Sequence, residues 1–87
     1  MKKRKLTELG SVGPATVGDL KILGITSVEE LIGRNPHELY QRLCSLTNTH
    51  HDICMLDIFC CAIAQAENPD LPDEQKRWFY WSKLRKN

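Results

Sequence analysis

The chain has 87 residues, a formal net charge of +1 and a hydrophobic fraction of 41%. This length suffices for one domain with its own core. The near-neutral balance excludes a molecule that attracts nucleic acid through its overall charge. The longest apolar run, residues 58–64, is far shorter than the ~20 residues of a membrane span, and no apolar signal segment follows the basic residues at 2–5. We expect a cytoplasmic protein that makes no contact with a membrane.

The first part of the chain predicts two helices joined by a sharp turn. A short helix is expected at about residues 5–9, and the glycine-rich segment 10–13 then turns the chain. Pro14 stands where a helix accepts proline, at its first position. Gly24 ends this second helix, and Ile25 is placed to pack back over its end.

Two further helices are expected before residue 47. Thr26 and Ser27 are both plausible N-caps for a short third helix that ends near Gly33, because each has a glutamate three residues later. The sequence does not choose between them. Asn35 and Pro36 then form a cap and proline pair that opens a fourth helix, extending to about Leu46.

The last part of the chain predicts a central helix and a covering helix. Residues 53–66 are apolar on nearly every side, which is typical of a helix in the middle of a bundle. A final helix is expected from about residue 72 to 82 or 84, and it carries four of the six aromatic residues. No segment alternates as a strand would. The sequence therefore predicts an all-α fold of five to six helices.

The segment LGSVGPATV, residues 9–17, resembles the hairpin of helix-hairpin-helix DNA-binding domains, which typically reads Leu-Pro-Gly-hydrophobic-Gly-Pro-Lys-Thr-Ala. Ser11 replaces the first hairpin glycine, and Gly10 beside it is expected to supply some of the lost freedom. Ala15 replaces the lysine that would touch phosphate. The run LGITSVEEL, residues 23–31, is similar to the C-terminal domain of the RNA polymerase α subunit.

A second resemblance covers nearly the whole chain. The segment HDICMLDIFCCA, residues 51–62, is similar to the pattern His-Asp-Pro-Cys-x-Leu-Asp-x-Phe-x-Cys-Ala of the bacterial pathogenicity-locus proteins, often called mitomycin-resistance-like. Ile53 stands where proline is usual. The chain is thus expected to hold a tandem helix-hairpin-helix unit of four short helices at residues 6–46, with a core helix and an aromatic lid helix at 52–84.

The hairpin resemblance implies contact with DNA phosphates through backbone amides, since a glycine-rich turn before a helix presents free N–H groups and a partial positive charge. The basic residues 2–5 are expected to form a solvated, mobile tail or, alternatively, an arm that contacts DNA. The second hairpin, residues 33–36, is expected to be a structural partner. The residues implied in phosphate binding are Ser11, Val12, Gly13, Ala15 and Thr16, together with Lys3, Arg4 and Lys5 of the basic block.

Cysteines and a lone carboxylate mark the predicted central helix. Cys54 and Cys61 lie two helical turns apart, about 10 Å by helical rise, which exceeds the ~7 Å limit for a disulfide. We expect reduced thiols with a structural role, although His50 and His51 beside them leave open a metal site or a reactive thiol.

The carboxylate, Asp57, must find a partner because burying it alone would be costly. The candidates are the indole N–H of Trp78 or Trp81, a histidine, or the free N–H groups at the start of another helix. The segment RWFYW, residues 77–81, is expected to be core, with base stacking as the alternative.

No arrangement of residues resembles a catalytic set, so we expect neither enzyme activity nor a metal or other cofactor. The sequence favours weak, sequence-independent DNA binding through the first hairpin. The alternative is a protein-interaction module that keeps the fold without DNA affinity, which the substitutions at Ser11 and Ala15 and the near-neutral charge would suit. Oligomeric state is left undecided.

Overall fold

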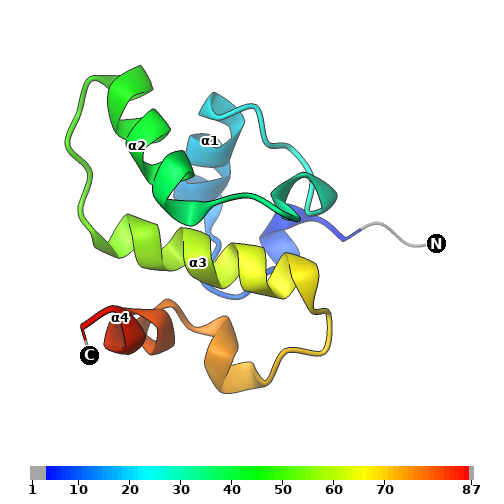
Figure 1. Ribbon diagram of the computed structural model, residues 1–87. Coiled ribbons are helices and arrows are strands. Elements are labelled where there is room, and N and C mark those ends of the chain that lie inside the picture. Colours follow the sequence, from blue (N-terminus) through cyan, green and yellow to red (C-terminus); the bar gives the residue numbers. More distant parts are fainter. Residues whose placement is uncertain (1–3, 87) are drawn as a thin grey trace.

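The computed structural model describes residues 4–86, and this part of the chain is helical with no strand (Figure 1). The four α-helices are α1 (Pro14–Ile22), α2 (Pro36–Thr47), α3 (Cys54–Glu67) and α4 (Trp78–Lys86). The chain also forms three short 3₁₀ helices: η1 (Leu6–Glu8) before α1, η2 (Glu29–Leu31) between α1 and α2, and η3 (Asp73–Lys76) between α3 and α4. The all-α prediction is confirmed.

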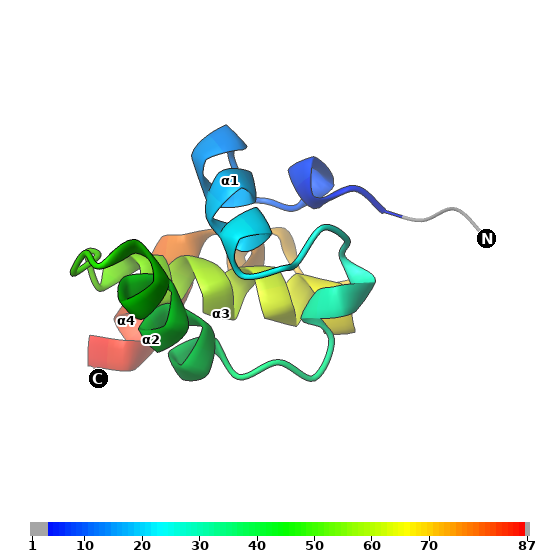
Figure 2. The same cartoon turned by 90° about the horizontal axis from the view of Figure 1, so that it is seen from above.

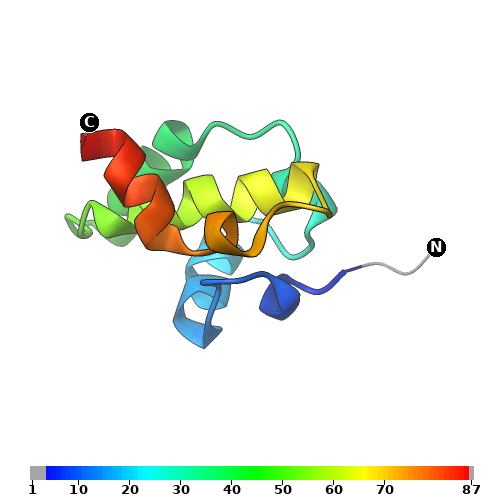
Figure 3. The ribbon, with the colours of Figure 1, turned by 90° about the horizontal axis from the view of Figure 1, so that it is seen from below.

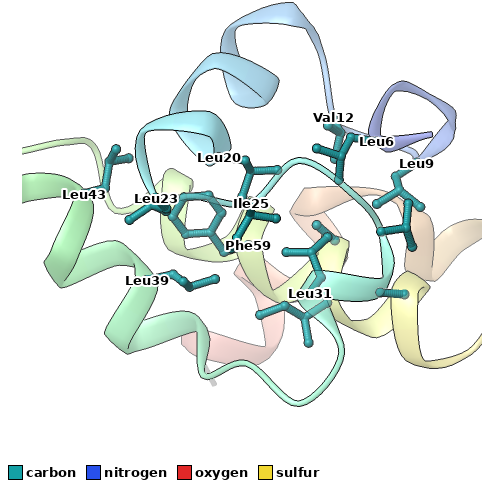
Figure 4. Close-up of a cluster of buried hydrophobic side chains, with 14 residues drawn as sticks. Leu6, Leu9, Val12, Leu20, Leu23, Ile25, Leu31, Leu39, Leu43 and Phe59 are labelled. Atoms are coloured by element: carbon teal, nitrogen blue, oxygen red, sulfur yellow. The ribbon is translucent and has the colours of Figure 1, made fainter. Parts of the chain in front are cut away.

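Helix α3 runs through the middle of the molecule, as its apolar composition predicts. Helices α1 and α2 lie on one side of it, while η3 and α4 lie on the other (Figure 1). Phe59 of α3 is completely buried and lies at the centre of the hydrophobic core, between α1 and α2 (Figure 4). Other core side chains with an exposed fraction of 0% are Leu20, Ile25, Leu31, Leu43, Cys61 and Ala62.

The number of α-helices is lower than the predicted five to six. The predicted first and third helices are single 3₁₀ turns, η1 and η2. At η2, the hydroxyls of Thr26 and Ser27 both donate to one carboxylate oxygen of Glu30, at 3.1 and 3.0 Å. Neither residue acts as the predicted N-cap, because the N-cap of η2 is Val28 and no side chain caps this turn. Gly33, with φ of 79°, turns the chain away soon after.

The predicted last helix divides into η3 and α4. Arg77 has φ of −107° and ψ of 130°, an extended conformation that interrupts the helical path between them. Asp52 accepts a hydrogen bond from the backbone N–H of Cys54 at 2.9 Å and so serves the start of α3. None of the helices within residues 4–86 combines the length and the apolar character needed to cross a membrane.

Candidate nucleic-acid interface

The first hairpin, residues 9–13, makes its turn at Ser11. Ser11 has φ of 66°, in the left-handed region that glycine usually occupies. Gly10 does not take a positive φ and so does not supply the lost freedom, contrary to the prediction. It is needed for another reason, because a Cβ atom on Gly10 would lie 2.5 Å from the backbone oxygen of Lys76. The turn is therefore pressed closely against the end of η3.

Side chains hold this hairpin against α3 and α4. The Gln65 amide accepts from the Gly10 N–H at 2.8 Å and donates to the Gly10 carbonyl at 2.9 Å. The Ser11 hydroxyl accepts from the N–H of Trp78 at 2.9 Å and donates to the carbonyl of Lys76 at 3.2 Å. Ser11 thus provides the hydrogen-bond acceptor that a helix N-terminus needs, although it lies 67 residues away from Trp78 in the chain.

The N-terminal turn of α1 projects away from the helices around α3 (Figures 2 and 3). Its N-cap residue is Gly13, which has no side chain to accept hydrogen bonds from the first turn. Within residues 4–86, no partner is bonded to the amides of Ser11, Gly13, Ala15 and Thr16. The amide of Val12 differs, because it donates to the carbonyl of Leu9 at 3.3 Å.

Helix α2 also begins with a proline, but its first amides are occupied. The Asn35 side-chain oxygen accepts from the N–H groups of His37 and Glu38 at 2.9 and 3.3 Å. In the hairpin that precedes α2, the N–H of Gly33 donates to a carboxylate oxygen of Glu67 at 3.0 Å. The two proline-started helices therefore differ: α2 is capped by its own chain, whereas the amides of Ala15 and Thr16 in α1 have no partner within residues 4–86. The Thr16 residue itself is only 7% exposed.

Basic side chains lie beside α1. Lys5 and Lys21 line an open groove of about 410 Å³ between η1 and α1, and Glu29 lines the same groove. The first turn of α1 contains no acidic residue, so the partial positive charge of the helix N-terminus is not offset locally.

The predicted basic tail is tied to the body of the protein at Arg4. The Arg4 guanidinium donates to the carbonyls of Gln65 and Ala66 at 2.7 and 2.8 Å, near the C-terminal end of α3. At Arg4 this differs from the mobile tail predicted for the basic residues 2–5, and it satisfies carbonyls that the end of a helix leaves unpaired. Lys3 lies outside the described residues.

Asp57 is buried as predicted, but its partner is one that the sequence analysis does not consider. Its side chain is 1% exposed. The Arg85 guanidinium forms a bidentate ion pair with it, with Nε–Oδ1 at 2.9 Å and Nη2–Oδ2 at 3.1 Å. The sequence predicts a tryptophan indole, a histidine or free helix amides as the partner. The Trp81 indole N–H instead donates to the carbonyl of Gln75 at 2.8 Å.

The cysteines of α3 show environments that disfavour a reactive thiolate. Burial raises the pKa of Cys61 to about 11. Burial also raises the pKa of Cys60, and a hydrogen bond to Asp52 raises that of Cys54. Over residues 4–86, no three His, Cys, Asp or Glu side chains gather as a metal site requires.

The aromatic segment at residues 77–81 is mostly packed inward. Trp78, Tyr80 and Trp81 are partly buried, and the rings of Tyr80 and Trp81 meet edge to face at 5.4 Å. Phe79 is 48% exposed, with the Arg77 guanidinium 6.0 Å from its ring centre. The segment therefore serves mainly as a cover for α3, and only one ring is well exposed.

The fold places the protein in the class of small all-α proteins, with an anchored hairpin and an uncapped α1. The chain belongs to the family described as Pathogenicity locus, whose family model matches residues 1–87. It is 35% identical over 81 residues to the mitomycin resistance protein McrB of Streptomyces lavendulae, an alignment that covers 93% of this chain and 73% of that protein. No solved structure shows a significant match. The predicted family membership is confirmed.

Proposed function

We propose that this protein binds DNA weakly and without sequence preference, and that it catalyses no reaction. The contact surface is the first hairpin with the start of α1. The observation that carries the proposal is the set of four unbonded amides on a hairpin held in place by Gln65 and Ser11. Amides fixed in this way are suited to DNA phosphates, because they point donors at an anion without side-chain reorganisation. The amides belong to Ser11, Gly13, Ala15 and Thr16.

This arrangement supports a tandem helix-hairpin-helix unit over residues 6–46, with residues 52–84 as its support. The proposal is for a cytoplasmic protein. The second hairpin would be structural, because Asn35 and Glu67 already occupy its donors. One hairpin neutralises two or three phosphates, so the logarithm of affinity should fall with that of salt concentration with a slope of roughly −2 to −3. Exposed Lys5 and Lys21 would add to this slope.

The second candidate function is a protein-interaction module. It is favoured by Ala15, an exposed residue without charge where DNA-binding hairpins of this kind carry lysine. It is also favoured by exposed apolar side chains such as Ile32 and Leu46, which are 52% and 56% exposed. In this case the uncapped start of α1 would accept an acidic group of a protein.

The substitution Gly13→Asp tests the DNA proposal sharply. A Cβ at Gly13 meets nothing within 4 Å, and an aspartate there would accept from the amides of Ala15 and Thr16 itself. It should therefore stabilise the fold by about 0.5 kcal/mol through capping and the helix dipole, while weakening DNA binding at least about tenfold, or 1.4 kcal/mol. Because stability is expected to rise while DNA affinity falls, the loss of binding could not be attributed to unfolding.

The matched control is Asn35→Asp, which places the same charge at the cap of α2 and keeps that cap in use. Fluorescence anisotropy of a labelled duplex at several salt concentrations would measure both variants, with urea denaturation for stability. Asn35→Asp should change affinity less than about twofold. Equal loss in both variants would show that net charge matters and the hairpin does not. Absence of binding by the native chain at low salt would move the protein-interaction module to first place.

A further inference from the structure

A second groove, of about 370 Å³, is lined by residues of α2, α3 and α4. Its size is within the range of roughly 300–1,000 Å³ that is usual for small-molecule pockets. Its apolar lining comes from Leu56 and Cys60 of α3 and Trp81 and Leu84 of α4, and its polar lining from His37 of α2, Asp57 and Arg85. Leu84 is 51% exposed, so the groove is open to a ligand from solvent.

The walls of this groove are fixed before any ligand arrives. The Trp81 ring is held by the hydrogen bond from its indole N–H to the Gln75 carbonyl and by its edge contact with Tyr80. The Arg85 side chain is held by its two hydrogen bonds to Asp57. A binding surface that is already ordered loses little conformational entropy when a ligand binds.

Arg85 has donors to spare at the edge of the groove. Its hydrogen bonds to Asp57 use Nε and one hydrogen of Nη2, and a guanidinium has five N–H donors. The other three carry no hydrogen bond within residues 4–86, and 30% of the side chain is exposed. Because Asp57 already balances the charge, the group that meets these donors needs an acceptor atom rather than a negative charge.

Cys60, which lines the groove on α3, adds no charge to it. Burial raises the pKa of Cys60, so its thiol stays protonated at neutral pH. Protonated thiols behave as small apolar groups with high polarisability. A flat apolar ring can therefore lie over Cys60 and against Trp81 without desolvating a charge.

We infer that this groove binds an uncharged, planar aromatic small molecule that carries a carbonyl group, with the ring against Trp81 and the carbonyl oxygen at Arg85. The inference does not depend on DNA binding, because the groove shares no residue with the first hairpin. The ring supplies the apolar contact with α3 and α4, and the carbonyl sets its orientation.

The test uses two probes that share one ring system: 2-naphthamide, which is neutral, and 2-naphthoate, which is an anion. Each is titrated into the ¹⁵N-labelled protein, and the amide and indole resonances are followed by NMR. We expect saturable shifts at the Trp81 indole, Cys60 and Leu84 with 2-naphthamide, and binding by 2-naphthoate that is no tighter. Absence of shifts at these residues up to millimolar probe, or clearly tighter binding of the anion, would overturn the inference.

Variants place the binding in the groove. Leu84→Glu puts a charge on the apolar wall and should weaken 2-naphthamide binding at least about fivefold, because the carboxylate would lose water when the ring binds. Leu46→Glu is the matched control, since Leu46 is a similarly exposed leucine on α2 that does not line the groove. Arg85→Lys keeps a charge for Asp57 but loses the planar fork, and should remove any advantage of the amide over the acid. Equal weakening by Leu84→Glu and Leu46→Glu would refute the assignment.

Discussion

Arg85→Met should be among the most destabilising single changes in α4, because it removes the partner of a buried carboxylate. Asp57 is 1% exposed and is held by two hydrogen bonds from Arg85. Breaking a buried pair from one side costs about 3–5 kcal/mol. We expect about 3 kcal/mol here, since the arginine side chain is 30% exposed and water can follow it. A chain of this length has a total stability of only roughly 4–13 kcal/mol.

Urea denaturation followed by far-UV circular dichroism measures this cost. Arg42→Met is the matched control, because Arg42 is exposed on α2 and makes no hydrogen bond or ion pair within residues 4–86. It should change stability by no more than about 0.5 kcal/mol. Adding Asp57→Leu to Arg85→Met should recover much of the loss, since no charge is then left buried. If Arg85→Met costs no more than Arg42→Met, the pair is not what holds α4 to α3.

Two further predictions concern backbone packing and pH. Gly10→Ala should destabilise the protein by about 1–3 kcal/mol, because its Cβ would lie 2.5 Å from the Lys76 oxygen. Gly18→Ala is the control: a Cβ there has open space around it, so this change should stabilise α1 by up to about 1 kcal/mol. Thermal denaturation compares the two variants, and equal effects would contradict the close contact at Gly10. The raised pKa of Cys61, about 11 against 9.0 for an ordinary thiol, means that the folded state keeps its proton longer. The free energy of unfolding should therefore fall as pH rises from about 9 to 11, by roughly 2–3 kcal/mol for this group. Urea titrations at several pH values should show a shallower fall for Cys61→Ala than for the native chain. Equal dependence on pH in the two proteins would refute the raised pKa of Cys61.

The helix starts that the sequence predicts well are those set by local chemistry. Asn35 and Pro36 place the start of α2 correctly, because a cap acts on amides two and three residues away. Helix α3 differs from its predicted range, 53–66, by only one residue at each end. The prediction is close because a helix that is apolar on nearly every side must be buried in the core. The same local signals predict α-helices at η1 and η2, where the chain forms only three-residue 3₁₀ turns. Segments this short cannot add enough hydrogen bonds to offset the cost of starting an α-helix.

The contacts that shape the candidate sites are long-range, and the sequence gives no local signal for them. Arg85 reaches Asp57 across 28 residues, Gln65 reaches Gly10 across 55, and Arg4 reaches the end of α3 across 61 or more. The need for a partner at Asp57 follows from the cost of burying a charge. The identity of that partner depends on how α4 packs against α3, which the sequence does not show. The sequence therefore favours Trp78 and Trp81, the indole donors of the same helix, over Arg85.

Ser11 shows why a departure from a sequence pattern need not be a defect. Its φ of 66° is costly for any residue but glycine, by about 1–2 kcal/mol, yet its hydroxyl provides the acceptor for the Trp78 amide at the start of α4. Ser11→Ala keeps the backbone cost and loses the acceptor, so it should destabilise by about 1 kcal/mol. Ser11→Gly loses the same acceptor but removes the strain, so its stability should stay close to that of the native chain. Chemical denaturation would rank the two variants, while hydrogen exchange at the Trp78 amide should accelerate in both. A glycine variant as unstable as the alanine variant would show that the left-handed turn carries no strain, and that the hydroxyl alone explains the serine.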